Sequence, residues 1–404
     1  MALGLIVGLS VWPAASVHGQ SGPVIDSSPV PEYRFGDPLT FTLSAHAAKD
    51  IVRVNLYVRA QADERTFTGL AQFASGTAVD GVYTFDPAQR ALSAFTPVTF
   101  WWEVADRDGN LARTDPATFV YADNRFDWQT LETPDGRLAV HWYAGDAALG
   151  QAALDAAVSG YAGARGVLPG AQLERANVYV YASDTDAHAA LESAGPFWAS
   201  GYANPAGESA LVIADPATPE ALSRLARDIP HEMMHLVAAH AGDGRMAGMP
   251  AWFNEGLAQL NEPTPNADAA ALLTSARADG TLRALADYCG PFPSDPADAR
   301  LAYAHSAAVV RHIRNQYGTP KLAELLSAYA SGLSCEAGVQ QTLGLTLAGL
   351  DQAWQAGPAV APGLGLSDSA SGWLVLAFLV VVVSPGLLLI GLGLTRPAKA
   401  GEPR

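Results

Sequence analysis

The sequence predicts a multidomain protein. Its expected parts are an N-terminal all-β sandwich of immunoglobulin or fibronectin kind, an α+β domain with a helical C-terminal half, and one C-terminal transmembrane helix. The chain has 404 residues, more than a single hydrophobic core usually organises. Apolar residues alternate with polar ones in the first quarter and recur at helical spacing later. Near the C-terminus, residues 373–394 carry no charged side chain.

The β-sandwich is predicted over residues 23–125. Short apolar runs of period two follow one another there, at 39–43, 52–58, 81–85 and 98–104. Turn signals, Asp80-Gly81 among them, are expected to separate the runs. Such strands at such spacing favour an antiparallel sandwich. Residues 106–110 lack the later glutamate of a calcium loop, so they predict a hairpin turn. We find no catalytic constellation in this part and expect a spacer or binding module.

The α+β domain is predicted over residues 137–356. Its expected strands are residues 137–144, 177–182 and 210–214. Its expected helices are residues 147–164, 301–317, 321–330 and 346–354. Gly318 and Gly332 are placed as helix stops. A small sheet followed by a helical half is typical of an α+β domain.

The two ends of the chain predict a membrane protein. Residues 373–394 are long enough as a helix to cross a bilayer, residues 357–372 suit a flexible tether, and residues 395–404 form a tail with Arg396, Lys399 and Arg404. Basic residues on this side place the tail in the cytoplasm and the body outside the cell membrane, in a single-pass arrangement. Residues 1–20 resemble an export signal or an N-terminal anchor.

Composition narrows the partners and the chemistry. The formal charge of -16 repels phosphate backbones, so nucleic acid is not an expected partner. Cys289 and Cys335 are the two cysteines, too few for a thiolate metal cluster, so any metal must use histidine and carboxylate ligands. In an oxidising compartment a Cys289–Cys335 disulfide is expected, and two unpaired buried thiols are the alternative.

The candidate metal-binding motif runs from His231 to His235. On a helix, two imidazoles four positions apart share one face and can bind one metal ion together. Glu232 directly follows the first imidazole, which places its carboxylate where it can reach a water at the metal. Pro230 precedes the motif. It either marks the first helical turn, with Asp228 as a cap, or bends the helix.

A third ligand is expected from the segment after the motif. Residues 250–260 predict a second helix on which Glu255 shares a face with apolar residues, and a bare carboxylate there would be costly. Glycines between the two helices allow the chain to reverse and bring the two faces together. Glu255 is therefore the predicted third ligand.

These residues resemble the gluzincin metallopeptidases, specifically peptidase MA-like domains, zincins with a His-Glu-x-x-His helix and a later Trp-x-x-Glu-Gly-Leu-Ala helix. The match is strong at His231, Glu232 and His235 and over residues 252–258, and it is softer over residues 303–318. The Gly-Ala-Met-Glu-Asn box of the aminopeptidase branch is missing, which removes the case for aminopeptidase specificity.

The resemblance implies a zinc-dependent metallopeptidase with one Zn²⁺ ion. A protein or peptide substrate would be hydrolysed by zinc-activated water, with Glu232 as general base. By its place in the downstream segment, Tyr303 is the expected donor to the developing oxyanion, with His305 in reserve. The predicted strand at residues 210–214 is the expected edge that receives an extended substrate.

Other functions were weighed against the same residues. A metzincin requires glycine and histidine where this chain has Ala238 and Ala241, and an intramembrane protease would carry the motif inside a membrane span. The alternative from another class is a non-catalytic surface adhesion or scaffold protein with a zincin-like binding domain. A hydrolase of non-peptide amides also stays open, since it would use the same residues.

Overall fold

The structure is a computed structural model that describes residues 22–60, 65–90, 92–191, 201–246, 248–264 and 266–357. The predicted export signal (1–20), transmembrane helix (373–394) and tail (395–404) lie outside these residues, as does the predicted tether beyond residue 357. No helix in the described ranges is both long and apolar enough to cross a membrane. The chain divides into two compact units after Trp354, and the elements below lie in the first, apart from the final residue of the last helix.

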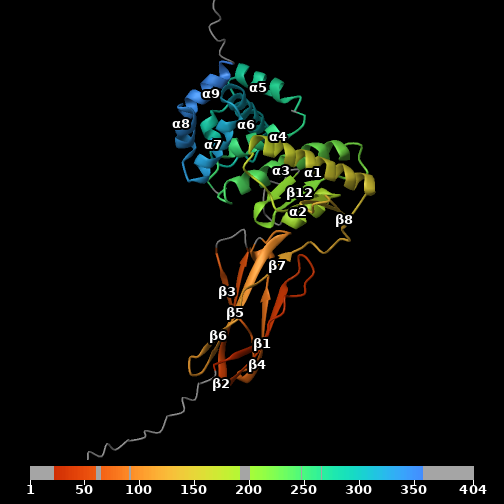
Figure 1. The fold of residues 1–404 in the computed structure, drawn as a ribbon, viewed down its shortest axis with the longest axis vertical. Helices are drawn as coiled ribbons and strands as arrows, with labels where there is room; N and C mark the ends of the chain where they lie inside the picture. Colours follow the sequence, from red (N-terminus) through yellow and green to blue (C-terminus); the bar gives the residue numbers. More distant parts are fainter. Residues whose placement is uncertain are drawn as a thin grey trace, which may run out of the picture. The chain divides into compact units, whose positions relative to one another are not determined.

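The N-terminal part is an antiparallel β-structure, coloured red to orange in Figure 1. Its strands are β1 (Val24–Ser27), β2 (Leu39–Ala60), β3 (Phe67–Leu70), β4 (Gly76–Phe85), β5 (Thr96–Asp106), β6 (Leu111–Arg113) and β7 (Ala117–Tyr121), with a short 3₁₀ turn η1 (Ala88–Arg90).

Strand β2 is shared between two layers. Its first half pairs with β1 and β4, its second half pairs with β3 and β5, and the register is irregular between His46 and Ile51. Across the layers, the rings of Phe41 on β2 and Phe100 on β5 lie 5.1 Å apart between centroids, and both are buried. Burying alternate side chains of both layers against each other makes the predicted β-sandwich, which is confirmed.

Two details of the sandwich differ from the sequence-based prediction. Residues 39–43 and 52–58 are parts of one strand, because no glycine or proline interrupts the chain between them. Asp80-Gly81 lies inside β4 and is not a turn. A Cβ atom at position 81 would stand 3.2 Å from Cγ1 of Val54, so this glycine makes room for a packed neighbour.

The predicted hairpin at residues 106–110 is confirmed. It joins β5 to β6, and Oδ1 of Asp106 accepts hydrogen bonds from the backbone N–H groups of Asp108 (3.0 Å) and Asn110 (2.9 Å). Gly109 has a φ of 84°, which only glycine adopts freely. The acidic side chain therefore closes a turn.

The second sheet has the strand order β11-β12-β10-β9-β8. Its strands are β8 (Gln129–Glu132), β9 (Leu138–Trp142), β10 (Ala176–Tyr181), β11 (Gly201–Asn204) and β12 (Ser209–Ile213), with the 3₁₀ turn η2 (Pro205–Gly207) between the last two. Strands β9, β10 and β12 are parallel, and β8 and β11 pair antiparallel at the two edges.

The helices of this domain follow the predicted pattern, and Figure 1 shows α1 and α3 running alongside the sheet. They are α1 (Ala147–Val167), α2 (Asp184–Leu191), α3 (Ala221–Ala241), α4 (Ala251–Asn261), α5 (Ala269–Ala278), α6 (Pro296–Tyr317), α7 (Thr319–Ala330), α8 (Cys335–Leu343) and α9 (Leu347–Gln355), with the 3₁₀ turn η3 (Leu285–Tyr288). Gly318 ends α6 and Gly332 follows α7, both at positive φ, as predicted.

The predicted edge strand was wrong. Residues 210–214 fall in and just after β12, which is buried along its length and pairs with β10 on one side and β11 on the other. An interior strand has no free backbone edge, so β12 cannot receive a substrate by strand addition. The edge beside it is β11.

Helix α3 begins at Ala221, well before the metal-binding motif, and Pro230 lies in its interior. Asp228 is therefore not the cap of this helix. Helix α1 packs closely against this point, since a Cβ atom at Gly160 would stand 2.6 Å from Cα of Pro230. The side-chain amide of Asn261 donates to the carbonyl oxygens of both Pro230 (2.7 Å) and Gly160 (2.9 Å), which ties α4 to this crossing.

The predicted disulfide between Cys289 and Cys335 is present, and it joins residues 46 positions apart in the sequence. The indole Nε1 of Trp252 on α4 donates to Sγ of Cys335 at 3.4 Å. The disulfide therefore links the start of α8 to the segment before α6 and contacts the helix that carries Glu255.

Candidate metal centre

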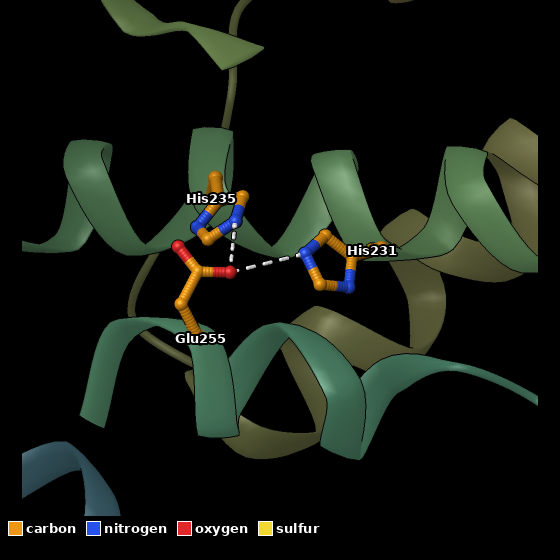
Figure 2. A group of neighbouring side chains, drawn as sticks. All are labelled: His231, His235 and Glu255. Carbon is orange, nitrogen blue, oxygen red and sulfur yellow. Dashed lines mark ion pairs between the residues drawn. The ribbon is translucent and has the colours of Figure 1, made fainter. Parts of the chain in front are cut away.

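Two adjacent helices carry the predicted ligands. His231 and His235 lie one turn apart on α3, with ring centroids 5.0 Å apart, and Glu255 lies on α4. Asp243 and Gly244 adopt positive φ between the two helices, so the chain can reverse within a few residues. Figure 2 shows both imidazoles on one helix and the Glu255 carboxylate reaching toward them from the other.

The three side chains converge on one point. Oε2 of Glu255 lies 3.4 Å from Nε2 of His231 and 3.6 Å from Nε2 of His235. One potential ligand atom from each of the three residues lies within 4.8 Å of the others. Each side chain keeps between 13% and 19% of its surface exposed, so the site is shielded and still reachable from solvent.

The donor set fits a divalent zinc ion. Two imidazole nitrogens and one carboxylate oxygen are the ligands of a catalytic zinc site, which keeps a further position open. The outer ring nitrogens are already engaged: Nδ1 of His231 contacts Oε1 of Glu262 at 2.9 Å, and Nδ1 of His235 contacts Oδ1 of Asn254 at 3.2 Å. Both imidazoles therefore turn Nε2 toward Glu255, as metal-binding histidines do when oriented by an outer acceptor.

Sequence reasoning missed both orienting residues. Asn254 directly precedes Glu255, and Glu262 follows it by seven positions, close to two helical turns. This spacing was a signal that Glu262 lies on the same side of the helix as Glu255. The partner of its carboxylate, however, depends on how α3 and α4 pack.

The charges of the three ligands are strongly coupled. Burial alone lowers the pKa of His231, but hydrogen bonds to Glu255 and Glu262 outweigh it and hold this pKa well above the ordinary value. Burial likewise lowers the pKa of His235, but the carboxylate of Glu255 outweighs burial and raises this pKa. Burial raises the pKa of Glu255, but the charges and hydrogen bonds of the two histidines outweigh it and depress the pKa. A divalent cation bound by these three side chains would replace the protons on the two rings.

Glu232 lies beside the ligands and makes no hydrogen bond with them. It is 5% exposed, and burial raises its pKa to about 7 although both histidines lower it. A carboxylate whose pKa lies near neutrality can take up and release a proton at physiological pH. A Cβ atom at Gly201 on β11 would stand 2.4 Å from Oε1 of Glu232, so the edge strand lies directly against this carboxylate.

A cavity of about 700 Å³ opens over this site. Residues from α3, the end of α4, the start of α5 and α6 line it, including His231, Glu232 and Tyr303. Burial raises the pKa of the Tyr303 hydroxyl, as do the charges of Glu255 and Glu232 and a hydrogen bond to Glu255, so this hydroxyl keeps its proton. The structure thus places Tyr303 at the wall of the cavity, beside Glu255.

The reserve candidate, His305, does not line this cavity. Its ring is fully buried, its Nε2 contacts Oδ1 of Asp351 at 3.0 Å, and it packs against Trp354. Tyr303 and His305 are two positions apart, about 200° around a helix, so they face opposite sides of α6. His305 is part of the packing between α6 and α9.

The sandwich contacts the end of β11 and the helix that precedes it in the sequence. The backbone N–H of Ala94 donates to the carbonyl of Ala190 at the end of α2 (2.8 Å), before β11 in sequence. At the last residue of β11, the side-chain amide of Asn204 donates to the hydroxyl of Thr96 at 3.3 Å, and both residues are buried. Residues 94–96, which lead into β5, therefore contact the end of α2 and the strand that lies against Glu232.

The arrangement is that of a zincin-type centre: two imidazoles from one helix, a carboxylate from the next, and a glutamate beside them. Residues 163–358 match the sequence model of the Peptidase MA superfamily. This part of the chain is accordingly a peptidase MA-like domain, which agrees with the predicted resemblance. No curated protein sequence matches the chain.

Several solved structures match the chain at low sequence identity. The M1 zinc metallopeptidase from Deinococcus radiodurans is 13% identical, with a TM-score of 0.35 over 83% of this chain and 94% of that chain. A mutant of that enzyme bound to a Tyr-Ser-Ala substrate is 12% identical, with a TM-score of 0.36 over 80% and 91%. An aminopeptidase N family protein from Idiomarina loihiensis is 10% identical, with a TM-score of 0.32 over 80% and 68%.

Proposed function

We propose that the protein is a zinc metallopeptidase that hydrolyses peptide bonds in the cavity beside His231. The observation that carries this proposal is the convergence of His231, His235 and Glu255 within 4.8 Å, with the buried Glu232 alongside. The Peptidase MA match over residues 163–358 supports it. The ligand set suits one Zn²⁺ ion per chain.

The mechanism assigns a role to each side chain. Zinc, when bound, supplies a Lewis acid that polarises the attacking water and the scissile carbonyl. Glu232 accepts the proton of the attacking water and passes it to the leaving amine, a role for which a pKa of about 7 is suited. The protonated hydroxyl of Tyr303 donates a hydrogen bond to the developing oxyanion. Glu262 and Asn254 keep the two imidazoles in the required orientation.

The edge strand β11 is the proposed docking edge for an extended substrate. It pairs with β12 through one side, and its backbone runs past Glu232. A peptide added along its other side would pass over the reacting groups. This replaces the interior strand β12 in the role that the sequence suggested.

The proposed location is the cell membrane, with a single span at residues 373–394, the catalytic body outside the cytoplasm and the C-terminus inside. The Cys289–Cys335 disulfide supports an oxidising compartment. External protease added to intact cells should degrade the body and leave the tail protected. Protection of the body until the cells are lysed would contradict this location.

The test of the catalytic proposal compares the full-length protein with Glu232→Gln. Both should bind zinc, and the variant should lose roughly 10²- to 10⁴-fold in peptide cleavage because it has no proton acceptor. Glu220→Gln is a matched control, since Glu220 flanks the start of the same helix and its side chain makes no capping hydrogen bond. Zinc binding without cleavage of a generic peptide library by the wild-type protein would favour a non-catalytic adhesion or scaffold role instead.

A further inference from the structure

Two of the three acidic side chains that line the active-site cavity are paired, and the third is the proposed general base. Asp228 accepts two hydrogen bonds from the guanidinium of Arg227, at 2.6 and 3.1 Å. Glu262 contacts His231, and Glu232 is the proposed general base. Among the described lining residues, no further carboxylate is left to bind a substrate ammonium group.

One cation of the same cavity is not neutralised in this way. Arg300 is exposed, lines the cavity and lies on α6 one turn before Tyr303. Its side chain makes no ion pair or hydrogen bond with the described residues, and positions 296, 297, 303 and 304, its neighbours one turn away, are uncharged. The nearby carboxylate of Asp298 is paired with Arg283 at 2.6 Å. Arg300 therefore presents its full charge to the cavity.

We propose that Arg300 is a carboxylate-binding subsite, so that the protein prefers peptides that carry a negative charge close to the reacting bond. A guanidinium binds a carboxylate with two parallel hydrogen bonds, and it is the side chain best shaped for this recognition. The carboxylate can belong to an acidic side chain or to the peptide C-terminus. Since the one unpaired carboxylate among the described lining residues is that of the proposed general base, the cavity offers a substrate amino terminus no separate anionic partner. The identification of the ligand as a substrate rests on the proposed function, whereas the preference for a carboxylate does not.

The test measures binding without turnover. Zinc-loaded full-length protein with Glu232→Gln is titrated with fluorescent peptides in two matched pairs: glutamate against glutamine at each internal position, and a free against an amidated C-terminus. The carboxylate member of at least one pair should bind about tenfold more tightly. Adding Arg300→Gln should remove the difference, and Arg300→Lys should keep part of it. Arg314→Gln, on the same helix and away from the cavity, is the control and should leave it intact.

The outcomes separate the two proposals. A preference in the glutamate pairs identifies a side-chain carboxylate, and one in the terminal pair identifies the C-terminus. Three outcomes would overturn the proposed subsite: equal binding within every pair, no peptide binding at all, or a preference that survives Arg300→Gln. Peptide cleavage by the wild-type protein decides the proposed function on its own, because it requires no charge preference.

Discussion

Gly201, on the edge strand β11, lies directly against the carboxylate of Glu232 on α3. A Cβ atom added at position 201 would stand 2.4 Å from Oε1 and 2.9 Å from Cδ of that side chain. The glycine is not needed for its φ, which lies outside the left-handed region. A side chain at this position would force Glu232, the proposed general base, to move. The position of the edge strand and that of the base are thus coupled.

Gly201→Ala should lower peptide hydrolysis by about 10- to 100-fold, because misplacing a catalytic group by about 1 Å is enough for such a loss. Zinc content should stay at the wild-type level, since none of the three ligands contacts Gly201. The measurement is kcat together with bound zinc per chain. Gly248→Ala is the control, because a Cβ atom there meets nothing within 4 Å. Equal kcat in the two variants would contradict the coupling.

Glu262→Gln should weaken zinc binding by about 10- to 100-fold, the usual effect of losing an outer partner of a metal-bound histidine. The amide keeps the shape of the side chain but removes the charge that orients His231. Competition with a chelating dye gives the affinity. Glu324→Gln, whose carboxylate pairs with Lys321 on the surface of α7, should bind zinc as the wild type does. The role of Glu262 is rejected if its variant also binds like the wild type.

The core of the site could be predicted because its information is local. Helical spacing alone puts His231 and His235 on one face, and the apolar neighbours of Glu255 signal a carboxylate that needs a cation. Helical spacing could also have excluded His305. It lies about 200° around the helix from Tyr303, so the two side chains cannot both face one cavity.

The parts that could not be predicted depend on contacts between distant segments. Strand β11 is four residues long, shows no alternating pattern, and owes its edge position to pairing with β12. The continuity of β2 depends on its exchange of partners between the two layers of the sandwich. By sequence, Pro230 could mark the first helical turn or bend the helix; it lies inside α3, at the point where Gly160 of α1 packs against it.

Zinc affinity should rise as the pH increases from about 6 to about 8, because a bound zinc ion must replace protons held by its ligands. The pKa of His231 is raised well above its ordinary value, so this ring keeps its proton to a higher pH than a free histidine. Calorimetry in buffers of different ionisation enthalpy should show protons released on zinc binding. The Glu262→Gln variant lacks one group that raises this pKa, so it should release fewer protons when it binds zinc. Affinity that does not change over this range would contradict the expectation.

Replacing both Cys289 and Cys335 by serine should lower the free energy of unfolding by about 2–4 kcal/mol, because a cross-link over 46 residues restricts the unfolded chain. Denaturant unfolding of the double variant beside the oxidised wild type gives the difference. The double change avoids leaving a reactive thiol. A midpoint that matches the oxidised wild type would show that the disulfide adds no stability.

Gly207→Ala tests whether the sandwich positions the edge strand. A Cβ atom at position 207, in η2, would stand 2.3 Å from the carbonyl oxygen of Phe95, a backbone atom that cannot rotate away. The turn after β11 must then move off the sandwich, which should lower stability by about 1–3 kcal/mol, the usual range for an overpacked contact. Because β11 also lies against Glu232, peptide hydrolysis should fall as well. Thermal unfolding and kcat/KM are compared with Gly170→Ala, where a Cβ atom meets nothing within 4 Å. Lower stability with unchanged hydrolysis would mean that the sandwich supports the fold but does not position β11 beside Glu232.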